Sequence, residues 1–100
     1  MTRYELWWAR VKYEYSTETK ERPVMIWNDC AYIIAYKLTT TDRGDNAEEF
    51  KIEHWKEAGL PKETFIRITK VIRLEKADLI KKIGKLDYRD QLRFNLRIIR

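Results

Sequence analysis

The stretch RPVMIWNDCAYIIAYKLT, residues 22–39, predicts two strands joined by a tight turn. Residues 23–27, PVMIW, form the first of them, with Pro23 at its first position, where a missing N–H donor is tolerated. Asn28 and Asp29 are a typical turn pair. Residues 30–38, CAYIIAYKL, are apolar nearly throughout, as expected of a strand that is buried on both faces. We therefore expect this second strand to lie at the centre of a sheet.

Residues 5–13, ELWWARVKY, alternate between two faces and predict a preceding strand with one buried face. One face carries Trp7, Ala9, Val11 and Tyr13, and the other, more polar face carries Leu6, Trp8, Arg10 and Lys12. Trp8 lies among cations there, where its ring could stack on a nucleic-acid base or simply pack under a loop. Residues 14–22, EYSTETKER, lack apolar periodicity and predict a loop.

The chain after residue 39 predicts more strand and then helix. Residues 40–50 read as a long polar loop, and the short piece 51–62 is ended by Gly59 and Pro61. Residues 64–74, TFIRITKVIRL, are β-branched and alternating, which indicates one bent strand or two. Residues 75–86, EKADLIKKIGKL, place apolar residues at helical spacing and predict a short helix with Gly84 as its C-cap; these residues are Leu79, Ile80 and Ile83.

Asp87 is suited to be the N-cap of a last helix. One stripe of this helix carries Leu92, Leu96 and Ile99, and the next carries Arg93, Arg97 and Arg100. The basic stripe could be a solvated face or could contact RNA. About five strands, a short helix and a C-terminal helix indicate a mainly β fold of the α+β kind. We expect a small barrel or strongly coiled sheet in a single domain spanning residues 1–100.

The net charge of +5 is distributed unevenly along the chain. Residues 1–60 carry 9 Lys/Arg and 11 Asp/Glu, a net of −2, and residues 61–100 carry 12 and 5, a net of +7. A basic half attracts a polyanion, either nucleic acid or an acidic protein segment. A single cysteine, Cys30, allows no internal disulfide, and no apolar run approaches the ~20 residues of a membrane span. The expected location is therefore the cytoplasm, away from membranes.

Histidine and cysteine, which often act as metal ligands or catalytic groups, are scarce in this chain. His54 is the only histidine and Cys30 the only cysteine, so no metal-ligand cluster is predicted. The three glycines lie far apart in the sequence, so no glycine-rich phosphate loop is predicted either. RNA cleavage can proceed without such groups, because the ribose 2′-OH beside the scissile phosphate is a built-in nucleophile. Arginine suits the stabilisation of phosphorane charge, and a hydroxyl can hydrogen-bond a phosphate oxygen without adding charge.

Several segments resemble the MazF/PemK toxins in their order and spacing: LWWARVKY, a polar loop, ERPVMIW, YKLTT and FIRITKVIRLEKADL. The resemblance spans nearly the whole chain. It implies an SH3-like β-barrel, a homodimer, and selective cleavage of single-stranded RNA that needs no cofactor or metal and leaves a 2′,3′-cyclic phosphate. It also implies an antitoxin whose acidic, partly disordered tail covers the basic RNA groove.

The same resemblance suggests residues for the site. The arginine of the family's R-P-V motif falls on Arg22, and its threonine falls on Thr39, so these two are the expected catalytic residues. A late-strand arginine and the carboxylate two residues after it fall on Arg67 and Thr69, so a hydroxyl replaces the family's carboxylate. The glutamates before Arg22, Glu18 and Glu21, are the candidates to replace it as proton acceptor. The expected substrate-binding residues are Thr40, Arg67, Thr69, Glu18 and Trp8.

Two other functions fit the same pattern. CcdB toxins are similar in fold but poison DNA gyrase through a Trp-Gly-Ile ending, whereas this chain ends in Arg97-Ile98-Ile99-Arg100. A degenerate, non-catalytic RNA-binding module would also be basic and would tolerate Thr69. Cleavage of RNA in the presence of EDTA separates an endoribonuclease from both.

Overall fold

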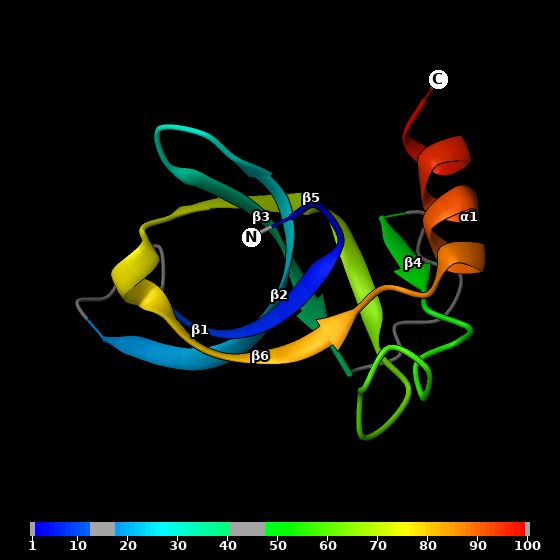
Figure 1. The fold of residues 1–100 in the computed structure, drawn as a ribbon, viewed down its shortest axis with the longest axis horizontal. Helices are drawn as coiled ribbons and strands as arrows, with labels where there is room; N and C mark the ends of the chain where they lie inside the picture. The colour runs from blue at the N-terminus through cyan, green and yellow to red at the C-terminus, as the bar shows by residue number, and fades with distance from the viewer. Residues whose placement is uncertain (1, 13–17, 41–47, 100) are drawn as a thin grey trace.

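The computed structural model describes residues 2–12, 18–40 and 48–99. These residues form a curled antiparallel sheet and one C-terminal helix, with a single 3₁₀ turn between the last two strands (Figure 1). The mainly β fold with a C-terminal helix is therefore confirmed. In chain order the elements are β1 (Glu5–Lys12), β2 (Thr19–Asp29), β3 (Ile33–Thr39), β4 (Glu49–Lys51), β5 (Phe65–Leu74), η1 (Lys76–Asp78), β6 (Leu79–Lys85) and α1 (Tyr88–Ile98).

The six strands form one sheet in the order β4-β5-β3-β2-β1-β6, with antiparallel pairing at each step. The sheet curls strongly, so β1 and β6 turn back toward β5, as Figure 1 shows. The curl stops short of a closed barrel, because no pairing joins the edge strands β4 and β6 among the described residues. β2 and β3 lie in the middle of the sheet. The central position of β3 was predicted from the apolar run of residues 30–38.

The central strands are buried on both faces, and each face has its own apolar core. On one face, Val24 and Ile26 of β2 pack with Ala35 of β3 and Leu74 of β5. On the opposite face, Met25, Tyr36 and Leu38 pack in a second cluster with the segment around Ile52 and with α1. A one-residue slip of β2 would exchange these two sets of side chains, so the register is strongly specified.

Phe94 attaches α1 to the second core. Its ring is fully buried and meets Tyr36 and Phe50 edge to face, with centroids 5.3 Å apart in each case, and Trp27 at 5.7 Å. Such edge-to-face pairs add stability beyond the area they bury. One residue later, Asn95 accepts a hydrogen bond from the Tyr4 hydroxyl at 2.7 Å. Aromatic packing and this bond fix the helix beside β4.

The short helix predicted over residues 75–86 is wrong. Only Lys76–Asp78 are helical, as a 3₁₀ turn, and Leu79–Lys85 form the edge strand β6 along β1. Gly84 is not a C-cap but a strand residue whose backbone passes close to the loop at Ala58. A Cβ on Gly84 would collide with the Ala58 carbonyl oxygen. The apolar spacing suited a helix, but short apolar runs are ambiguous and the open edge of β1 decided the outcome.

Other element boundaries in the structure also differ from those predicted from the sequence. β2 starts at Thr19, because the polar residues before Arg22 pair with β1, and it continues through Asn28 and Asp29, so the bend falls at residues 30–32 instead. Pro23 therefore lies inside β2, just outside the β2–β3 ladder that begins at Val24. Leu6 was expected on the more polar face of the strand, but it is fully buried in the core that also contains Phe94 of α1. Tyr13 lies outside the described residues.

The helix α1 has its N-cap where the sequence predicted it. The Asp87 side chain accepts hydrogen bonds from the backbone N–H and the guanidinium of Arg89, and these bonds hold the pKa of Asp87 at about 2. The face directed to the core carries Asp90 and Phe94. The predicted apolar stripe, by contrast, is exposed to solvent: Leu92 at 47%, Leu96 at 76% and Ile99 at 73%.

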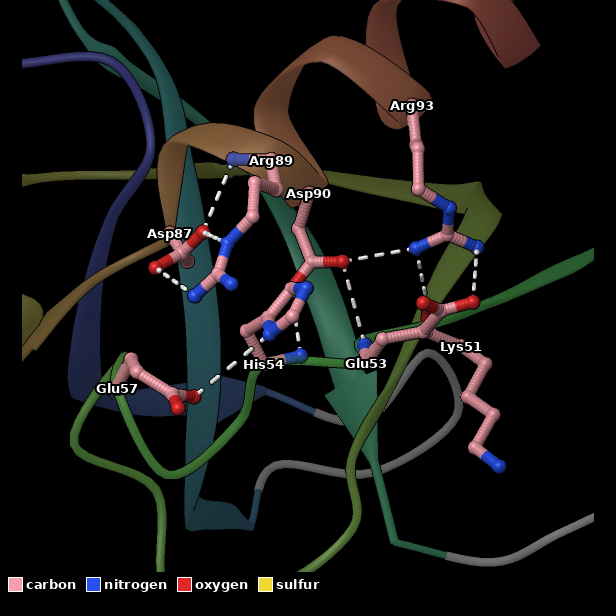
Figure 2. Close-up of polar contacts among 8 residues, drawn as sticks. All are labelled: Lys51, Glu53, His54, Glu57, Asp87, Arg89, Asp90 and Arg93. Atoms are coloured by element: carbon pink, nitrogen blue, oxygen red, sulfur yellow. Dashed lines mark hydrogen bonds and ion pairs between the residues drawn. The ribbon is translucent and has the colours of Figure 1, made fainter.

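Asp90 ties the start of α1 to the loop that follows β4 (Figure 2). Its carboxylate is fully buried and accepts hydrogen bonds from the backbone N–H groups of Glu53 and His54, at 3.2 and 2.8 Å. Arg93 donates to the same carboxylate at 2.8 Å and also contacts Glu53 at 3.3 Å. A buried carboxylate is tolerated when hydrogen bonds and a counter-ion compensate it. Asp90 therefore holds residues 53–54, near the start of the segment that connects β4 to β5.

Replacing Gly84 by alanine should destabilise the fold. The new methyl group must push β6 away from the Ala58 carbonyl, and overpacking of this kind costs about 1–3 kcal/mol. Urea unfolding of Gly84→Ala, with the exposed neighbour Lys85→Ala as the control, measures the effect. An unchanged midpoint for Gly84→Ala would mean that this close approach is absent in solution.

Replacing Asp90 by asparagine should loosen the loop after β4. One amide oxygen cannot serve both backbone donors and Arg93 as the carboxylate does, so we expect a loss of about 1–3 kcal/mol. Hydrogen exchange at the Glu53 and His54 amides should become faster. Asp87→Ala, which removes the helix cap but not this tie, serves as the control. Equal protection of the two amides in Asp90→Asn and the parent would contradict the assignment.

Candidate active site

The antiparallel register brings the two expected catalytic residues together. Val24 of β2 lies opposite Lys37 of β3. Two residues earlier in β2 is Arg22, and two residues later in β3 is Thr39, so both lie just beyond the same end of this ladder. Thr39 in turn pairs with Phe65 of β5, two residues before Arg67. Arg22, Thr39 and Arg67 thus lie on three neighbouring strands.

A single cavity of about 530 Å³ collects these side chains. It opens at the end of the central strands and is bounded by the loop of residues 60–64. Among the described residues, those that line it are Trp8, Val11, Glu21, Arg22, Pro23, Lys37, Leu38, Thr39, Thr40, Leu60, Pro61, Lys62, Thr64, Arg67 and Ile83. Five of the seven expected site residues therefore line this cavity: Trp8, Arg22, Thr39, Thr40 and Arg67.

The cavity is strongly cationic. Among the lining side chains that the structure describes, four are basic, Arg22, Lys37, Lys62 and Arg67, and one is acidic, Glu21. Arg22 is exposed, and its Nη1 donates to the Glu21 backbone carbonyl at 2.9 Å. Four cations around one carboxylate fit a polyanionic ligand such as a nucleic-acid backbone.

Apolar side chains make the rest of the lining. Trp8 is 37% exposed and stands on β1 opposite Pro23 of β2 and Lys81 of β6. Leu60 and Ile83 lie on the same cavity. A partly exposed indole at the edge of a cationic cavity is a suitable surface for stacking a base.

Two of the expected residues do not line the cavity. Glu18 is exposed before the start of β2, and Thr69 is exposed in β5. The pairing of β3 with β5 explains the position of Thr69. Tyr36 lies opposite Val71 and Leu38 opposite Ile66, so residues 67–70 bulge against Lys37 alone. A bulge breaks the two-residue alternation, so Thr69 does not follow Arg67 into the cavity.

A different carboxylate lies beside Arg67. Glu49 of β4 is directly opposite Arg67 in the β4–β5 pairing, and its Oε2 is 3.9 Å from Arg67 Nε. Sequence reasoning missed Glu49, Lys37 and Lys62. Lys37 carried a usable signal, because it lies two residues before Thr39 on the same strand. Glu49 carried none, since β4 lies in a segment that was expected to be loop.

His54 lies away from the cavity, in the turns of residues 53–59. Its Nδ1 is 3.9 Å from Glu57 and its backbone N–H is bound by Asp90, so its contacts belong to the α1 attachment (Figure 2). In the described part of the chain no group of three or more His, Cys, Asp or Glu side chains is arranged to hold a metal ion. Within the same residues no helix has the length and hydropathy to cross a membrane.

Comparison with models of protein families identifies the family of this chain. Comparison with curated proteins finds no match. The family model described as PemK-like, MazF-like toxin of type II toxin-antitoxin system matches residues 2–100, which is nearly the full sequence. The matched region contains every strand, the helix α1 and all residues of the cavity. The chain therefore belongs to the PemK-like, MazF-like toxins of type II toxin–antitoxin systems.

Proposed function

We propose that this toxin is an endoribonuclease that cleaves single-stranded RNA in the cavity at the end of β2, β3 and β5. The observation that carries the proposal is the convergence of Arg22, Thr39 and Arg67 on one cavity, beside Glu21 and Trp8. Arginine and hydroxyl groups recognise a phosphate, the carboxylate can take a proton, and the indole can hold a base. Family membership supports the proposal, since the resemblance implies RNA cleavage.

In the proposed reaction, the ribose 2′-oxygen attacks the adjacent phosphorus and the bond from phosphorus to the 5′-oxygen breaks. Glu21 accepts the 2′-OH proton, because it is the carboxylate among the described lining residues. Arg22 and Arg67 stabilise the charge that builds on the phosphorane oxygens, and Thr39 orients the phosphate. The departing 5′-oxygen takes up a proton from water. The products are a 2′,3′-cyclic phosphate and a 5′-hydroxyl end.

No cofactor is needed for this sequence of steps, since the substrate supplies the nucleophile and the protein supplies charge and orientation. We also propose that the toxin acts in the cytoplasm. There its cognate antitoxin inhibits it by laying an acidic tail over the cationic cavity, where the tail competes with RNA for the same side chains.

We further propose that the toxin is a homodimer and that α1 supplies the contact. Tyr88, Leu92, Leu96 and Ile99 recur at helical spacing and are between 47% and 76% exposed. A helix stripe can pack against its own copy across a two-fold axis. Two of the neighbouring arginines are paired within the chain, which reduces charge repulsion beside the stripe: Arg89 is bound by Asp87, and Arg93 by Asp90 and Glu53.

Replacing Arg22 by alanine should abolish toxicity and leave the fold intact. The loss of a group that meets transition-state charge typically costs on the order of 10²–10³ in rate. Purified protein is incubated with a single-stranded transcript in EDTA, and cleavage ends are mapped. Arg73→Ala, which removes an arginine that stacks on Tyr32, is the matched control.

Three results would contradict the proposal. Growth arrest by a well-folded Arg22→Ala protein would remove the assigned role. RNA bound but uncleaved by the parent protein would indicate the RNA-binding module instead. Intact RNA together with inhibited DNA gyrase would indicate a CcdB-like toxin.

Replacing Leu96 by lysine should convert the protein to a monomer. Light scattering should report twice the chain mass of 12.2 kDa for the parent and one chain mass for Leu96→Lys. Val71, 48% exposed on β5, provides the control, because Val71→Lys changes an exposed apolar residue outside the stripe. Dissociation by Val71→Lys but not by Leu96→Lys would place the interface on the sheet.

A further inference from the structure

The residue pair Glu49–Arg67 joins a buried carboxylate to a cavity arginine. The Glu49 side chain is only 4% exposed, whereas that of Arg67 is 25% exposed. Residues directly opposite each other in an antiparallel pair project to the same side of the sheet. The β4–β5 register therefore places the two side chains together, with Glu49 Oε2 3.9 Å from Arg67 Nε.

Glu49 contacts Arg67 without being one of the described residues that line the cavity. Arg67 lines the cavity, while Glu49 is absent from the described lining residues. A guanidinium has five donors, of which Nε carries one and the two terminal nitrogens carry four. The printed ion-pair contact is made by Nε at 3.9 Å, so it does not use the two terminal nitrogens of this cavity-lining side chain. Bidentate contact from those nitrogens is how arginine recognises a phosphate.

The two residues that flank Glu49 are held by contacts of their own. The next residue, Phe50, is buried and packs edge to face against Phe94 of α1 at 5.3 Å. The preceding residue, Glu48, accepts a hydrogen bond through its carbonyl from the Ile68 N–H at 2.8 Å. β4 is only three residues long, but these contacts hold it to both β5 and α1.

We propose that Glu49 is a positioning residue that holds the Arg67 guanidinium in the orientation required by the scissile phosphate. An arginine side chain loses much rotamer freedom when it is held in one orientation, and a charge pair made before the substrate binds meets that cost in advance. Glu49 contacts neither the substrate nor the reacting atoms and acts only through Arg67. The proposal rests on the proposed function, because it assumes that Arg67 meets an RNA phosphate.

The test compares Glu49→Gln, Arg67→Gln and the double variant in single-turnover cleavage of a single-stranded transcript. Glu49→Gln keeps the shape of the side chain and removes its charge, so cleavage should slow by about 10- to 100-fold through misplacement of the arginine. Binding of the same transcript with 2′-O-methyl riboses, which cannot be cleaved, should change by less than about threefold. In the Arg67→Gln background the second substitution should have no further effect.

Glu49→Asp keeps the charge and should retain more activity than Glu49→Gln, which a purely structural role would not require. If Glu49→Gln does not fold, Glu49→Asp takes its place in the double-variant comparison. Cleavage at the parent rate by a folded Glu49→Gln protein would overturn the proposal, as would an equal slowing in the Arg67→Gln background. Absence of cleavage by the parent protein would instead contradict the proposed endoribonuclease function.

Discussion

The register between β2 and β3 is the constraint on which the site depends. Val24 is held opposite Lys37 because alternate residues of both strands are committed to two different cores. A shift by one residue would bury the wrong set of side chains on each face. The same register brings Arg22 and Thr39 to the same end of the ladder, where the apolar residues stop and polar residues begin. Packing energy in the middle of the sheet thus fixes polar geometry at its end.

Much of this could be predicted from sequence, because the signals are local. Alternation in residues 5–13 predicted β1, the apolar run 30–38 predicted β3, and Asp87 predicted the start of α1. β6 could not be predicted, since Leu79, Ile80 and Ile83 suit a helix equally well. Only pairing with β1 and the tight approach of Gly84 to Ala58 select the strand. The orientation of α1 was hidden for a similar reason: Phe94 and Ile98 meet the core, although Leu92, Leu96 and Ile99 form the more regular stripe.

The candidate site divides in the same way. Arg22, Thr39 and Arg67 were named from short motifs, and the structure brings all three to one cavity. Thr69 was named by counting two residues from Arg67, and that count fails because a bulge interrupts the pairing of β5 with β3. Lys62 and Glu49 reach the region from segments with no motif, so only the fold reveals them. The charge of the cavity was equally hidden, because Arg22 and Lys37 belong to the half of the chain that is acidic as a whole.

The bulge also bears on how the proposed reaction distributes its carboxylates. A carboxylate two residues after Arg67 would need to enter the cavity, and the bulge leaves position 69 exposed outside it. Two other carboxylates lie near the chemistry. Glu21 shares the cavity with Arg22, where it can accept a proton, and Glu49 is buried against Arg67, which it orients in our proposal. Separating proton transfer from orientation lets each carboxylate have the environment its task needs: solvent access for Glu21, and burial against a cation for Glu49. On this mechanism, the threonine at position 69 removes nothing that the reaction requires.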